Sequence, residues 1–205
     1  MKNMNFISLF AASCAASALV CGAAEAGKPT NAEMVMKASF KDRGQAKVDR
    51  LNQDETQRLC SQYPHKRPTE IAKRIEALNM KLVKYPPDGK LLGDWKEGEK
   101  IAQSGVGKQF SDDPARPAGG NCYACHQLTL QEISFGNIGP SLLNYGKLRG
   151  NTEATQKYTF GKIYNAEAYS ACSNMPRFGH NGILTEEQIK HVTALLLDPN
   201  SPVNK

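Results

Sequence analysis

Two cysteines and a histidine lie close together in the middle of the chain, Cys122, Cys125 and His126, in the order C-x-x-C-H. This order is typical of covalent c-type haem attachment. Two thiols on one short turn can add to the two vinyl groups of a single porphyrin, and the adjacent histidine can bind its iron. A thioredoxin-like dithiol does not need the histidine, and a zinc site needs further Cys or His ligands at suitable spacing. The motif therefore predicts one haem c, with His126 as the proximal axial ligand.

The sixth position of the iron separates electron transfer from ligand chemistry. Met175 follows the haem motif in a loop before the last predicted helix, and Pro176 stiffens its approach. His180 is the competing ligand, whereas His191 falls inside the helix. We favour Met175, because methionine with histidine is the common axial pair of electron-transfer haems. Iron held by Met175 and His126 is saturated and should carry electrons.

The N-terminus predicts export. Lys2 precedes an apolar stretch, residues 6–20, that is too short to span a bilayer, and a small-residue Ala-Glu-Ala sequence ends at Ala26. We expect residues 1–26 to be a signal peptide cleaved after Ala26, and the mature chain to be periplasmic with no membrane span. Lipid attachment at Cys21 is the alternative, but the valine before it is bulkier than such sites normally allow.

Two further cysteines remain in the mature chain outside the haem motif, Cys60 and Cys172, once the signal peptide has removed Cys14 and Cys21. An oxidising compartment favours a disulfide between them. Such a bridge would tie the N-terminal part of the mature chain to the loop of Met175. Two free thiols are the alternative.

The charge balance is basic. The sequence has 26 Lys and Arg against 20 Asp and Glu, a formal net charge of +6. Residues 1–26 carry one lysine and one glutamate, so the charge of the mature chain is the same. In an exported protein we interpret this excess as attraction of anionic substrates or of an acidic redox partner, and we expect no nucleic-acid partner.

The mature chain divides into a polar, helix-prone extension, residues 27–90, and a haem domain, residues 91–205. In the extension we expect a short helix over residues 54–60 and a second helix capped by Thr69. The second helix has one apolar face. Its members are Ile71, Ile75, Leu78 and Leu82.

The haem domain should begin and end with a helix. Asp94 and Glu97 are spaced as a capping pair for a first helix that runs to about Ser104. Thr185 and Gln188 have the same spacing at the last helix. The buried stripe of that helix is Ile189, Val192, Leu195 and Leu196, and Asp198-Pro199 ends it.

From Leu91 onward this order of segments resembles a class I c-type cytochrome, in which the first and last helices cross. The resemblance implies an all-α class I cytochrome c fold with a helical N-terminal extension. Gly139-Pro140 resembles the cytochrome segment whose proline carbonyl accepts the N–H of the proximal histidine. We therefore expect Pro140 to orient His126.

Within class I the haem domain resembles the SoxX type, the monohaem subunit of the periplasmic cytochrome that begins thiosulfate oxidation. The likeness rests on five segments, which are residues 120–127, 136–142, 164–165, 174–179 and 183–199. The resemblance implies a heterodimer with a SoxA-type haem subunit, a SoxYZ-type carrier protein as the thiosulfate acceptor, and a small acceptor cytochrome c.

The chain would then be the electron-transfer subunit of an L-cysteine S-thiosulfotransferase, with no catalytic residue of its own. A free-standing periplasmic class I electron carrier is the alternative. A haem-based ligand or peroxide enzyme is a third reading, which would require Met175 to dissociate from the iron.

Overall fold

The computed structural model describes residues 32–205, so the predicted signal peptide and its cleavage site lie outside the described residues. The chain forms two compact units, of which the first ends at Ser39 and the second is Phe40–Lys205. Residues 32–205 are helical and contain no β-strand, only one isolated bridge between Arg43 and Ala46. The predicted all-α class is confirmed. No helix in this range is long and apolar enough to cross a membrane.

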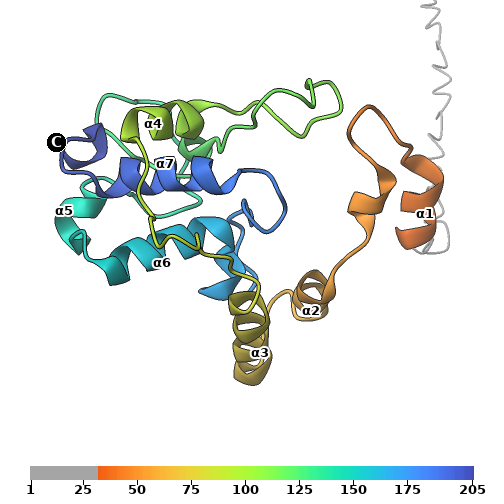
Figure 1. The fold of residues 1–205 in the computed structure, drawn as a ribbon. Helices are drawn as coiled ribbons and strands as arrows, with labels where there is room; N and C mark the ends of the chain where they lie inside the picture. The colour runs from red at the N-terminus through yellow and green to blue at the C-terminus, as the bar shows by residue number, and fades with distance from the viewer. Residues whose placement is uncertain (1–31) are drawn as a thin grey trace, which may run out of the picture. The chain divides into compact units, whose positions relative to one another are not determined.

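The first unit contributes α1, Ala32–Ser39, and the second unit holds the other described helices (Figure 1). The α-helices of the second unit are α2 (Glu55–Gln62), α3 (Thr69–Met80), α4 (Trp95–Gln103), α5 (Tyr145–Arg149), α6 (Glu153–Tyr164) and α7 (Glu186–Leu197). Four 3-10 turns accompany them: η1 (Val48–Leu51), η2 (Cys122–Ala124), η3 (Ala166–Ala168) and η4 (Pro202–Asn204).

The first and last helices of the haem domain, α4 and α7, pack against each other as expected for class I (Figure 1). Gly98 lies at their closest approach, where a Cβ atom would overlap with the backbone carbonyl of His191. A glycine is therefore needed at this point of the crossing. Ala102 of α4 and Leu195 of α7 are fully buried in the core, and α6 packs on α7.

The capping residues of α4 and α7 agree in part with those predicted from the sequence. Thr185 and Gln188 form the predicted capping box of α7. Asp94 caps α4, but its carboxylate accepts the N–H of Lys96. Glu97 is not the capping partner that we predicted, because its carboxylate binds a lysine one turn further along α4. The predicted stripe of α7 is buried: Ile189, Val192, Leu195 and Leu196.

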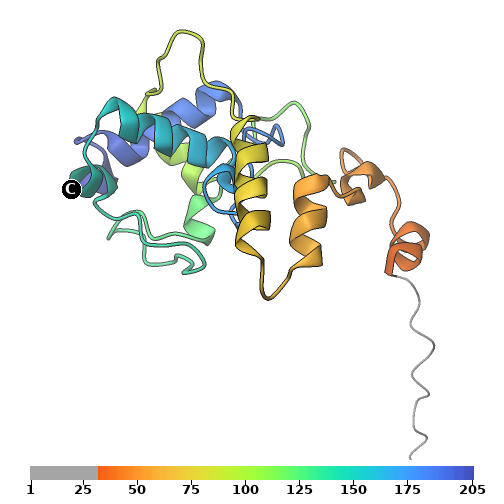
Figure 2. The ribbon, with the colours of Figure 1, turned by 90° about the horizontal axis from the view of Figure 1, so that it is seen from below.

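The extension forms a helical hairpin, in which α2 and α3 lie side by side (Figure 2). Helix α3 begins one residue earlier than predicted, because Pro68, and not Thr69, occupies the N-cap and Thr69 is the first helical residue. Ile75 is fully buried. Leu82, however, lies beyond the end of the helix at Met80 and is exposed, so the predicted apolar face is shorter.

The hairpin packs onto the haem domain within one compact unit. The buried amide of Asn79 in α3 donates to Thr56 of α2, and its carbonyl oxygen accepts the amide of Asn165 at the end of α6, at 3.0 Å. Buried polar groups paired in this way stabilise one particular docking of the helices. The compact unit Phe40–Lys205 therefore includes this hairpin together with the predicted haem domain, residues 91–205.

Candidate haem-binding site

The C-x-x-C-H motif forms a single tight turn, η2, that begins after Asn121 in the left-handed backbone region. The N–H groups of Cys125 and His126 both donate to the carbonyl of Cys122, at 3.1 and 2.9 Å. Cys122 and Cys125 are free thiols, and both are half-buried. The two sulfurs and the imidazole thus belong to one short turn, as attachment of both thiols to one porphyrin requires.

A second segment, residues 136–142, runs alongside the motif and is fixed to it by backbone hydrogen bonds. Three N–H groups of this segment donate to carbonyls of the motif or of the residue after it, at 2.8 to 2.9 Å. The pairs are Gly136 with Tyr123, Gly139 with Cys125 and Leu142 with Gln127. This pairing brings the Gly139-Pro140 peptide against the histidine.

The imidazole of His126 is oriented by Pro140, as predicted from the resemblance. Its Nδ1 lies 2.7 Å from the carbonyl oxygen of Pro140. A carbonyl can only accept, so Nδ1 carries the proton and the lone pair of Nε2 is available to a metal. Gly139 lies against the ring, and a Cβ atom there would overlap with the imidazole. Two thiols with an oriented imidazole form the donor set of haem c, so these residues fit the group.

The environment of Cys122 disfavours the redox-dithiol alternative. Burial raises the pKa of this thiol to about 12. Redox-active C-x-x-C pairs instead need a thiolate whose pKa lies well below the ordinary value. Cys122 packs against the apolar core cluster, and such a site suits a thiol that becomes a neutral thioether.

The two proposed sixth ligands face different surroundings. Met175 is half-buried and packs against the same apolar core cluster as Cys122. His180 is also half-buried, but it interacts with the charges of Arg177 and Asp54. Burial and the nearby arginine lower the pKa of His180. The apolar surroundings of Met175 are those that a thioether needs beside a haem.

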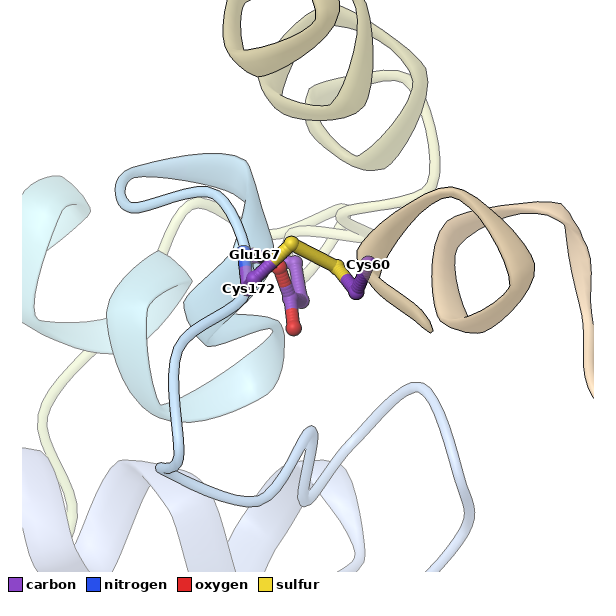
Figure 3. A group of neighbouring side chains, drawn as sticks. All are labelled: Cys60, Glu167 and Cys172. Atoms are coloured by element: carbon purple, nitrogen blue, oxygen red, sulfur yellow. Dashed lines mark hydrogen bonds between the residues drawn. A yellow bond between two sulfur atoms is a disulfide. The ribbon is translucent and has the colours of Figure 1, made fainter. Parts of the chain in front are cut away.

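The loop of Met175 is bonded to the extension by a disulfide. Cys60, in the last turn of α2, and Cys172 are joined, with their Cα atoms 5.6 Å apart (Figure 3). The sequence left open whether these two cysteines form a bridge or remain free thiols, and the structure contains the bridge. The bond fixes α2 to the chain three residues before Met175.

Sequence reasoning missed a second anchor on the other side of Met175. The guanidinium of Arg177, which is buried, lies 2.6 Å from the carboxylate of Asp54, the N-cap of α2. Burial disfavours the charged form of Asp54, but the N–H of Gln57 and the charge of Arg177 outweigh it and hold the pKa of this carboxyl below its usual value. The sequence spacing of Asp54 and Gln57 signals the cap, whereas nothing local signals Arg177 as partner.

Comparison with known proteins agrees with this site. Residues 98–198 match the family model of cytochrome c. The chain contains a cytochrome c family domain. This cytochrome is also 36% identical over 208 residues to a protein of Aquifex aeolicus described as an uncharacterized lipoprotein, and the alignment covers 96% of this chain and 98% of that protein. Family membership makes this cytochrome an electron-transfer protein with covalently bound haem c.

The disulfide should contribute strongly to stability. It closes a span of 112 residues, for which chain entropy predicts a loss of ~4 to 5 kcal/mol in the free energy of unfolding when both cysteines are replaced. We expect this loss in a C60S/C172S variant, measured by guanidinium unfolding of the haem-loaded protein. Lys73→Ala, an exposed change on α3, is the control and should alter stability by less than about 0.5 kcal/mol. Quantitative labelling of two thiols without reductant would contradict the bridge.

Proposed function

We propose that this cytochrome is the monohaem electron-transfer subunit of a periplasmic SoxAX-type cytochrome. Two observations carry the proposal: the imidazole of His126 is oriented by Pro140, and Met175 packs against the same apolar core cluster as Cys122 of the haem motif. The segments that resemble the SoxX type include these residues. Axial ligation by His126 and Met175 is part of the proposal.

Each residue of the site has a role in this proposal. Cys122 and Cys125 would hold the porphyrin through thioethers, His126 would bind iron through Nε2, and Met175 through its sulfur. When bound, haem c accepts and releases one electron at a time. With His126 and Met175 as its two protein ligands, the iron would have no free position for substrate. The sulfur chemistry would therefore belong to a partner subunit.

The proposed overall reaction balances without a catalytic group on this chain. A cysteine thiol of a SoxYZ-type carrier protein and thiosulfate form a sulfur–sulfur bond, the thiol proton leaves, and two electrons are released. We propose that these electrons pass singly from a SoxA-type subunit through this cytochrome to a small acceptor cytochrome c. An enzyme activity would thus belong to the heterodimer.

Exposed apolar side chains after the haem motif support a protein partner at this side of the molecule. Ile133 is 91% exposed, and it lies in a loop that returns to the motif at Gly136. Apolar side chains exposed together commonly mark protein interfaces. The large exposed apolar residues of this loop are Leu130, Ile133 and Phe135, and Ile138 follows in the segment that runs beside the motif.

Replacement of Met175 tests the ligation. Met175→Ala should abolish the weak near-infrared sulfur-to-iron band of the oxidised protein and lower its reduction potential, because loss of the thioether removes a ligand that favours the ferrous state. Met80→Ala, an exposed change on α3, should leave both unchanged. If the wild type shows no such band and its haem spectrum changes in His180→Ala but not in Met175→Ala, the sixth ligand is His180.

Reconstitution tests the partner. The purified chain should be catalytically silent alone and should form a complex with a SoxA-type subunit that reduces cytochrome c when thiosulfate and a SoxYZ-type carrier are added. Replacing Ile133 with Asp should weaken that complex by about tenfold or more, because a charge would be buried in the interface. Lys157→Ala on the exposed part of α6 is the control. Absence of both complex and stimulation would favour the free-standing electron carrier.

We also propose that the chain is exported and cleaved after Ala26. The mass of the protein recovered from the periplasm should correspond to a chain that begins at Gly27. The description of the Aquifex relative as a lipoprotein makes Cys21 the specific alternative. A mature chain that begins at Cys21, carries acyl groups and sediments with membranes would contradict cleavage at Ala26.

A further inference from the structure

Met175 lies between two residues that are both fastened to the short helix α2. On one side, Cys172 is bonded to Cys60 in the last turn of α2. On the other side, Arg177 forms an ion pair with Asp54 at the N-cap of the same helix. These two anchors hold the ends of the segment, but neither one sets the orientation of the peptides that lie between them.

Glu167 contacts the peptides next to the first anchor. It lies in η3, is buried, and accepts the N–H of Cys172 at 2.5 Å. Figure 3 shows its carboxylate beside the disulfide. Burial raises the pKa of Glu167, while the N–H groups of Cys172 and Ser173 and the charge of Arg177 favour its ionised form. The carboxylate therefore binds the N–H groups of Cys172 and Ser173, which precede Met175 in the chain.

The backbone at this point needs such support. Cys172 has φ +59°, a left-handed conformation that is strained for residues other than glycine. A hydrogen bond from its N–H to a buried carboxylate stabilises this conformation, and loss of the acceptor would leave the N–H without that partner. The next hydrogen bond leads to the proposed ligand, because the N–H of Met175 donates to the hydroxyl of Ser173 at 3.2 Å.

We propose that Glu167 is a positioning residue for the axial methionine, which it holds toward the iron by fixing the Cys172-Ser173 backbone. This inference rests on the proposed ligation by Met175. Glu167 binds the backbone of the loop at Cys172 and Ser173, and it would act on Met175 through that backbone. Helix α2 has a related role. It supplies both anchors of the segment that contains Met175, so the extension is part of the proposed haem site.

Binding of imidazole to the ferric protein measures how often Met175 leaves the iron. An added ligand can enter only in the open state, so its apparent affinity increases with the open fraction. The hydrogen bonds of Glu167 stabilise the closed loop. Their removal in Glu167→Ala should raise the imidazole affinity by about tenfold, since bonds to charged groups contribute about 1.4 kcal/mol or more.

A second variant keeps the test valid if alanine prevents folding. Glu167→Gln retains the shape and one acceptor but loses the charge. Charge-assisted bonds are roughly twice as strong as neutral ones, so the affinity should rise by about threefold. Hydrogen exchange of the peptide that spans residues 171–177 should become faster in both variants. This readout does not depend on electron-transfer activity.

Tyr145→Phe is the matched control for general loss of stability. It removes a buried hydrogen bond between the Tyr145 hydroxyl and Thr159, which joins α5 to α6. It should lower the thermal midpoint and leave imidazole affinity within twofold of the wild type. The inference is overturned if the Glu167 variants also stay within twofold, or if Tyr145→Phe raises the affinity as much as they do.

Met175→Ala separates this inference from the proposed function. It should bind imidazole more tightly than any Glu167 variant, because the protein ligand is gone. If Met175→Ala binds imidazole as the wild type does, Met175 is not the ligand and the proposed ligation fails. If Met175→Ala responds and the Glu167 variants do not, only the role of Glu167 is wrong.

Discussion

The hydrogen bond between the His126 imidazole and the Pro140 carbonyl is the constraint on which the haem site depends. It fixes the ring plane and the tautomer together, so that Nε2 presents a lone pair. That geometry requires residues 136–142 to run beside the motif and a glycine at position 139 to let the ring approach. Because residues 136–142 return to the haem motif, the chain between them forms the exposed apolar loop.

Met175, the proposed sixth ligand, is held in a different manner. Histidine is positioned by residues close to it in sequence, whereas the loop of Met175 is fastened to α2 through Cys172 and Arg177. The extension is therefore a structural part of the haem unit, which explains why the compact unit starts at Phe40. Its buried polar contact between Asn79 and Asn165 adds specificity to the docking.

The sequence predicted what depends on local patterns. The C-x-x-C-H turn, the crossing helices and the capping box of Thr185 depend on residues near one another or on a family order, and all are present. Two predictions were wrong within a single helical turn: Thr69 is not the cap of α3, and Glu97 binds a lysine of α4 instead of the N-cap. Sequence spacing alone does not distinguish these alternatives. The Arg177–Asp54 pair joins distant segments through packing, and no local pattern encodes it.

The different supports of His126 and of the Met175 loop both suit an electron-transfer site. Gain or loss of an electron is easiest when the ligands need little movement, and both proposed ligands are held in place before the electron arrives. On the histidine side, short backbone hydrogen bonds leave little freedom. On the methionine side, a disulfide and an ion pair resist opening of the loop, which would otherwise expose the iron to added ligands. In the proposed ligation, the extension would favour electron transfer over ligand chemistry, because its two anchors would keep Met175 on the iron.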